Sequence, residues 1–151
     1  MPTILSGKKW RLVYSKKVHG KSYNTLLSKC STEGPVMLVV LDYQGNVFGG
    51  FVSVTLEQKP NYFGTGETFL YKLEHQQMVL TAKMPTMDNL YFLHCSPDGI
   101  GFGSDPHFGL FINSELDSGS SHTCKTFDNQ PLSSKTEFGI KRIELWAIDL
   151  F

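Results

Sequence analysis

The chain has 151 residues, 40% of them hydrophobic, which predicts a single domain over residues 1–151 with its core within about 9–150. Its 14 basic and 14 acidic residues balance, so no positive surplus is available for phosphates and nucleic acid is not an expected partner. No apolar run reaches the roughly 20 residues of a membrane-spanning helix, so we expect no membrane insertion.

The first predicted elements are a strand and a helix. Residues 9–14 (KWRLVY) have the composition of a strand, and residues 15–21 form a polar loop. Ser22 has the side chain of a helix N-cap, and an apolar stripe at helical spacing follows it as far as Cys30. The sequence Glu-Gly-Pro at 33–35 then ends the helix.

Residues 35–54 hold the pattern around which the chain is organised. An unbroken apolar run at 36–41 predicts a strand that is covered on both faces. The turn-forming residues at 42–46 lead into a second apolar run at 47–54, so the pair predicts a β-hairpin too apolar for a sheet edge. Gly49-Gly50 in the second strand indicates either a bulge or a closely approaching backbone.

The rest of the chain alternates short apolar runs with turn residues, and a long polar stretch at 113–135 is anchored by Cys124, Phe127 and Leu132. In the last strand, 138–150, the apolar residues change parity, which predicts a bulge near 141–142. The other short strands are predicted at 68–73, 78–82, 90–95, 99–103 and 110–112. These elements predict an α+β, mainly β fold: a sandwich of two antiparallel sheets with about two short helices at its margin.

Glu67 is the first residue that could carry a function. It follows two glycines in Gly64-Thr65-Gly66-Glu67, where a carboxylate can approach a partner's backbone or accept bonds from its own turn. The turn lacks the Gly-Lys-Ser/Thr ending of a phosphate loop. The glycines at 99–103 run into Ser-Asp-Pro instead of a helix, which argues against a dinucleotide site.

The cysteines and histidines do not form a recognisable metal or catalytic motif. His94-Cys95 and His122-Thr123-Cys124 lack the spacing of a zinc site, and the chain contains no Gly-x-Ser-x-Gly elbow. An odd number of distant cysteines favours a reducing, intracellular setting. Cys30 and Cys95 lie in apolar segments and are expected to be buried, whereas Cys124 in the long loop is the candidate redox thiol, expected to be exposed and to react quickly.

Eight motifs follow one another along the chain: WRLVYS, HGKSYNTLLSKC, GPVMLVVLD, GNVFGGF, YFGTGETFLYKL, GSSHTCKTFDN, LS and IELWA. In their order and approximate spacing they resemble the TLDc domain of the oxidation-resistance protein family, over residues 10–147. Two segments depart from the family pattern: 101–109 has fewer glycines, and 112–115 stands where relatives place an aspartate-bearing turn. The LysM and TBC segments of longer relatives are absent, so we expect a short isoform or an isolated domain.

The resemblance implies a sandwich of two antiparallel sheets with two helices, in agreement with the predicted elements. It also implies a eukaryotic protein that protects cells from oxidative damage, as a non-catalytic interaction domain that binds and regulates the vacuolar proton-pumping ATPase. We expect a cytoplasmic monomer, recruited to endomembranes, with no cofactor and no bound metal. The candidate binding surface combines three loops and consists of His19, Gly20, Gly64, Gly66, Glu67, Gly119, Ser121 and Asn129. The alternatives are a peroxide scavenger that depends on the Cys124 thiol, or an unrecognised enzyme.

Overall fold

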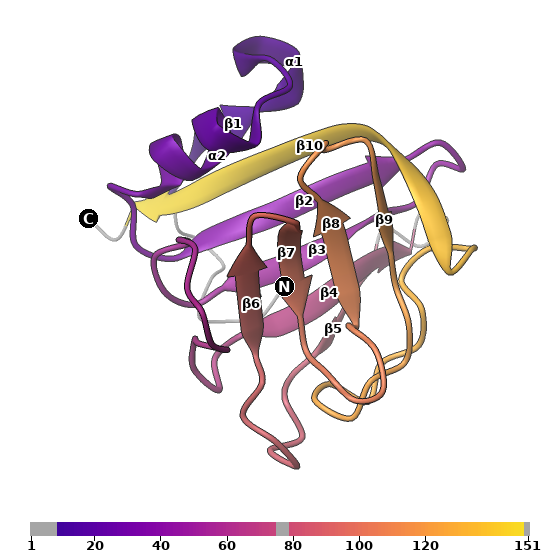
Figure 1. Cartoon of the computed structure of the whole chain (residues 1–151). Coiled ribbons are helices and arrows are strands. Elements are labelled where there is room, and N and C mark those ends of the chain that lie inside the picture. The colour runs from indigo at the N-terminus through magenta and orange to yellow at the C-terminus, as the bar shows by residue number, and fades with distance from the viewer. Residues whose placement is uncertain (1–8, 75–78, 150–151) are drawn as a thin grey trace.

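Two antiparallel β layers face each other, and two short helices lie beside one margin of the first layer (Figure 1). The structure is a computed structural model, and it describes residues 9–74 and 79–149. The first layer contains β1 (Lys9–Ser15), β10 (Glu137–Asp149), β2 (Val36–Asp42), β3 (Val47–Val52), β4 (Phe69–Glu74) and β5 (Val79–Lys83). The second contains β9 (Ser118–Ser120), β8 (Leu110–Asn113), β7 (Gly99–Phe102) and β6 (Leu93–Ser96). The predicted fold class is therefore confirmed.

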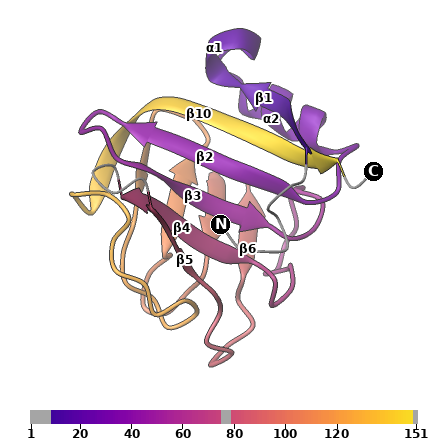
Figure 2. The same ribbon diagram turned by 180° about the vertical axis from the view of Figure 1, so that it is seen from behind.

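The hairpin of β2 and β3 lies in the middle of the first layer, as predicted. β2 pairs with β3 and β10, and β3 pairs with β2 and β4, so neither strand is an edge (Figure 2).

Asp42 at the end of β2 fixes the turn, because its Oδ1 accepts hydrogen bonds from the backbone N–H groups of Gln44 (3.0 Å) and Asn46 (2.8 Å). Its Oδ2 accepts a third bond from Ser133 Oγ at 2.6 Å. Although burial by itself raises the pKa of Asp42, these bonds together hold the pKa below its usual range.

The long strand β10 joins the two layers. Its first residues pair with β9, and its later residues pair with β2 and β1. The register with β2 shifts between Ile140 and Arg142, which confirms the bulge predicted from the change of apolar parity. The bulge lets one strand turn from one layer into the other.

Gly49 and Gly50 serve close packing, not a bulge, because the register of β3 with both neighbours is regular. A Cβ on Gly49 would lie 1.8 Å from the carbonyl oxygen of Leu38, to which the Tyr71 hydroxyl donates a hydrogen bond of 2.7 Å. A Cβ on Gly50 would lie 2.5 Å from the ring of Phe102 in the opposite layer. Gly50 therefore lets the two layers meet, and Gly49 leaves room for the Tyr71 hydroxyl at the Leu38 carbonyl.

Two elements were not predicted. The single turn α1 (Lys16–His19) buries no side chain, so it leaves no apolar pattern in a loop that is otherwise polar. β9 is a Ser-Gly-Ser segment whose strand conformation comes from pairing with β8 and β10. The predicted helix α2 (Tyr23–Cys30) is confirmed together with its cap, since Ser22 Oγ accepts a hydrogen bond from the backbone N–H of Thr25 at 3.2 Å.

The main core fills the space between the layers, and a second apolar cluster covers the outer face of the first layer. The second cluster centres on Met37, Phe51, Phe69 and Tyr71. Within residues 9–74 and 79–149, the structure contains no helix with the length and hydropathy needed to cross a bilayer.

The glycine packing predicts a large effect for one added methyl group. In Gly49→Ala, the new Cβ would overlap a backbone carbonyl that cannot move without breaking the sheet, so we expect a loss of about 3 kcal/mol or more in the free energy of unfolding. Gly34→Ala is the matched control, because nothing lies within 4 Å of its added Cβ. Chemical denaturation of both variants measures the difference, and equal stability would contradict the packing described here.

Candidate functional site

The predicted binding residues lie at two ends of the sandwich and in its interior, and they do not form one continuous surface. His19 ends α1 and Gly20 follows it at one end, and the turn at 64–67 lies at the other. Figure 1 shows α1 and the connection from β8 to β9 at one end, and the connection from β5 to β6 at the opposite end. We call residues 16–21 with 113–118 the lysine end, and residues 64–67 with 84–91 the apolar end.

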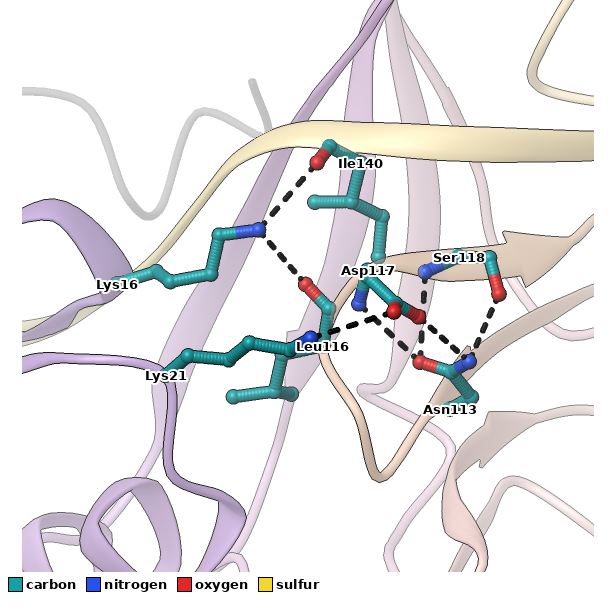
Figure 3. A network of polar contacts seen from close by, with 7 residues as sticks. All are labelled: Lys16, Lys21, Asn113, Leu116, Asp117, Ser118 and Ile140. Carbon is teal, nitrogen blue, oxygen red and sulfur yellow. Dashed lines mark hydrogen bonds and ion pairs between the residues drawn. The ribbon is translucent and has the colours of Figure 1, made fainter.

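At the lysine end, Lys16 ties the helical turn to the sheet (Figure 3). Its ammonium donates to the carbonyl oxygens of Leu116 at 3.0 Å and Ile140 at 3.4 Å. Burial lowers the pKa of Lys16, and the neighbouring charge of Lys21 lowers it further. Lys21 in turn pairs with Asp117 at 3.3 Å. The ammonium of Lys16 thus satisfies backbone groups and is not free to bind a ligand.

His19 is held by its own loop. Its Nδ1 accepts a hydrogen bond of 3.0 Å from the backbone N–H of Ser15, and its ring stacks on Tyr14 with the centroids 5.7 Å apart. The Tyr14 hydroxyl donates to the carbonyl of Gly20. Gly20 has a φ of 86°, a conformation that favours glycine. The motif residues of this loop therefore shape the turn that follows α1.

A second set of hydrogen bonds fixes the lysine end from the β8–β9 turn. The side chain of Asn113 donates to Asp117 Oδ1 at 3.0 Å and to Ser118 Oγ at 2.7 Å. The hydrogen bond from Asn113 is the main reason why the pKa of Asp117 lies below its usual range, and the charge of Lys21 also lowers this pKa. Gly119 follows in β9, where an added Cβ would meet the backbone oxygen of Phe111 at 2.2 Å. Gly119 is thus required by strand packing.

At the apolar end, the turn at 64–67 is stabilised without the carboxylate of Glu67. The backbone N–H of Thr65 donates to Ser53 Oγ at 3.1 Å, and the N–H of Glu67 donates to Thr65 Oγ1 at 3.2 Å. Among the residues that the structure describes, none forms a hydrogen bond or ion pair with the exposed Glu67 carboxylate. Gly64, with φ 96°, packs its backbone against Leu93. The hydroxyl groups of Ser53 and Thr65 therefore stabilise this turn, and the Glu67 carboxylate is not needed for it.

Beside this turn, the segment 84–91 exposes large apolar side chains. Met84 is 48% exposed, Met87 57%, Leu90 63% and Tyr91 50%. The sequence analysis did not select these residues as a surface. It assigned Leu90 and Tyr91 to a strand at 90–95, but β6 begins only at Leu93, so the start of that predicted strand is wrong. The available signal for 84–89 was an apolar content interrupted by Pro85 and Asn89.

Hydrogen bonds to the loop at 121–135 hold this exposed segment in place. The backbone N–H of Thr86 donates to the carbonyl of Thr126 at 2.8 Å, and Thr86 Oγ1 donates to the carbonyl of Lys125 at 2.8 Å. The hydroxyl of Thr126 donates to Asn89 Oδ1 at 2.8 Å. The apolar side chains therefore project from a fixed backbone, which lowers the conformational cost of binding a partner.

Ser121 and Asn129 lie in the interior and contribute no side chain to a surface. Ser121 Oγ donates to the carbonyl of Gly109 at 2.7 Å, and the amide of Asn129 donates to the carbonyl of His122 at 2.9 Å. Both side chains are fully buried. Their hydrogen bonds give the loop at 121–135 its shape.

The expectation of an exposed Cys124 is wrong. Its side chain is 1% exposed, its Sγ lies 3.2 Å from Asn129 Oδ1, and burial raises the pKa of the thiol. The long polar loop folds back on the core and inserts the side chains of its three apolar anchors, Cys124, Phe127 and Leu132. Their apolar character was visible in the sequence, but the polar composition of the loop outweighed it.

Aromatic and histidine rings line the outer side of the second layer. Tyr62 packs against Tyr91 and His94, with ring centroids 4.8 and 5.1 Å apart, beside a shallow pocket of about 420 Å³. His107 and His122 lie side by side, with centroids 4.6 Å apart. Within the described part of the chain, however, no group of three or more His, Cys, Asp or Glu side chains could hold a metal ion.

The sequence was also compared with known proteins. A family model described as the TLDc domain matches residues 1–149. Oxidation resistance protein 1 of Homo sapiens is 36% identical over 151 residues, which cover 99% of this chain and 17% of that protein. Nuclear receptor coactivator 7 is 35% identical in Homo sapiens and 34% in Gallus gallus, over 99% of this chain and 16% of each relative. The chain thus spans about a sixth of the length of these relatives.

The burial of the cysteines predicts slow thiol chemistry. Cys30, Cys95 and Cys124 are at most 1% exposed. Burial raises the pKa of each of these thiols, and it raises that of Cys30 to about 12. Because only the thiolate reacts, we expect maleimide to label all three far more slowly than a free cysteine, and denaturant to remove the difference. Mass spectrometry over time measures the labelling. Rapid modification of Cys124 in the folded protein would contradict its placement.

Proposed function

Because the chain belongs to the TLDc domain family, we propose that it protects cells against oxidative damage as a non-catalytic interaction domain that binds and regulates the vacuolar proton-pumping ATPase. Relatives that align over 99% of this chain are named for oxidation resistance, which supports the first part of the proposal. The second part rests on the family resemblance and on the surface chemistry of the apolar end.

The observation that carries the proposal is the exposed apolar side chains of residues 84–91. Met and aromatic residues are enriched in protein–protein interfaces, and large apolar groups gathered on one surface mark binding sites. Leu90 and Tyr91 also line the pocket beside Tyr62, which offers a partner an aromatic wall. This surface suits a protein partner better than a small polar substrate.

Glu67 adds a charge to the edge of this surface. A carboxylate with no described partner, next to exposed apolar groups, can accept a charge-assisted bond from a basic residue of the partner. A cation on the ATPase would satisfy it, and closure of the apolar contacts around the pair would exclude water. The proposed contact surface is therefore the apolar end, with Glu67 as its charged residue.

The proposal places the protein in the cytoplasm, as a monomer that is recruited to endomembranes carrying the pump. A thiol-dependent scavenger is not proposed, because all three cysteines are buried and the pKa of each thiol is raised. No other observation favours a second function.

We expect two substitutions at the apolar end to weaken binding to the purified ATPase without lowering the melting temperature. Glu67→Gln removes the charge and should cost roughly 2–5 kcal/mol of binding if the pair is desolvated. Leu90→Ser removes an exposed apolar contact. Neither side chain holds the fold, since the Glu67 carboxylate makes no described bond and Leu90 is 63% exposed. Binding is measured by surface-immobilised titration, and melting by calorimetry.

Tyr43→Ser is the matched control, because Tyr43 is a large apolar side chain, 67% exposed, on the distant β2–β3 turn. It should leave binding unchanged. Full retention of binding in both Glu67→Gln and Leu90→Ser would exclude the apolar end, and a loss in Val18→Ser instead would assign the contact to the lysine end. Absence of binding by the unaltered chain would refute the proposed function.

A further inference from the structure

The sulfur-containing side chains of the described residues differ sharply in their exposure to solvent. The three cysteines are at most 1% exposed, and Met37 is 5% exposed. Met84 and Met87 are 48% and 57% exposed. Within residues 9–74 and 79–149, these two methionines are therefore the only sulfur-containing residues that are exposed to a dissolved oxidant in the folded chain.

The chemistry of the two kinds of sulfur increases this difference. A thiol must first ionise to react with a peroxide, and burial raises the pKa of each cysteine here. A thioether reacts without ionising. One peroxide oxygen forms a bond to sulfur as the O–O bond breaks, so the sulfur is oxidised by two electrons and the peroxide is reduced to water or an alcohol. The product, methionine sulfoxide, is polar, and sulfoxide reductases convert it back to methionine.

Met87 is placed where such a change would act on the turn at 64–67. Its Sδ lies 3.5 Å from the position that a Cβ on Gly66 would occupy, so the thioether packs over the glycine that precedes Glu67. The backbone of Met87 has a φ of 68° and follows Thr86, which is bonded to the loop at 121–135. Met87 thus rests on the turn from a fixed position, and an oxygen added to its sulfur would enter that contact or draw the side chain into water.

We propose that Met84 and Met87 are peroxide oxidation sites, and that sulfoxide at Met87 displaces the turn at 64–67 and weakens docking at the apolar end. The oxidation and the displacement of the turn stand on the geometry alone, while the loss of docking rests on the proposed function. Peroxide would then weaken docking at the apolar end, and reduction of the sulfoxide would restore it. Met84 has similar exposure and provides the comparison within the same segment.

The first experiment needs no partner. The folded chain is treated with a small excess of hydrogen peroxide, and peptide mass mapping follows which residues gain one oxygen atom. We expect Met84 and Met87 to gain it before Met37 and before any of the three cysteines. Amide resonances of residues 64–67 should shift on oxidation in the unaltered chain and in Met84→Leu, but not in Met87→Leu. Treatment with sulfoxide reductases should return the shifted resonances to their original positions.

The second experiment compares ATPase binding before and after oxidation, with each variant referred to its own untreated sample. Oxidation should weaken binding severalfold in the unaltered chain and in Met84→Leu, and should have little effect in Met87→Leu. An equal loss in Met87→Leu would overturn the assigned role of Met87. Earlier oxidation of Met37 or of a cysteine, or unchanged resonances at 64–67, would overturn the proposal without any partner. If the untreated chain does not bind the ATPase, the proposed function fails, and mass mapping and resonance shifts still decide the oxidation sites.

Discussion

The fold depends on one strand that has to serve two layers. β10 pairs first with β9 and then with β2 and β1, and the bulge between Ile140 and Arg142 lets it pass from one layer to the other. Because the two layers share this strand, their separation is fixed at one margin by covalent geometry. The opposing faces must then fit at the distance that results. At Gly50, which lies against Phe102, this fit leaves no room for a side chain. Lys16 stabilises the bulge of β10 by donating a hydrogen bond to the carbonyl of Ile140.

The sequence was most informative where side chains decide the structure. The apolar runs of β2 and β3, the cap at Ser22 and the parity change in β10 all reflect burial or hydrogen bonding that follows directly from residue type. α1 buries nothing, and β9 is a strand because its neighbours supply the ladder, so neither leaves a local pattern. The loop at 121–135 shows the same limit, since its composition is polar while its path takes Cys124 into the core. Pairing and burial that arise only from distant segments cannot be predicted from a local window.

The candidate site was predictable only in part, because the motif residues have different tasks. Gly20, Gly64 and Gly119 are glycines for reasons of backbone shape or packing, and Ser121 and Asn129 brace a loop from within. Glu67 differs, since its turn is stabilised by hydroxyl groups and its carboxylate faces outward. The apolar residues beside Glu67 belong to no motif that was recognised in the sequence. The hydrogen bonds of Thr86 fix these residues to the loop at 121–135, and the contact of Met87 with Gly66 places them beside the turn; both depend on residues distant in the sequence.

The pairing of β1 with β10 has a consequence for how the domain is carried in longer polypeptides. Lys9 and Asp149 are register partners, so the chain enters and leaves the described structure on neighbouring strands, about 5 Å apart. A unit with adjacent entry and exit points can be inserted into a host chain, or placed at either of its ends, without separating the flanking segments. In the relatives matched here, the corresponding region makes up about a sixth of the protein. A small TLDc domain of this kind can be joined to other segments of a polypeptide at little structural cost.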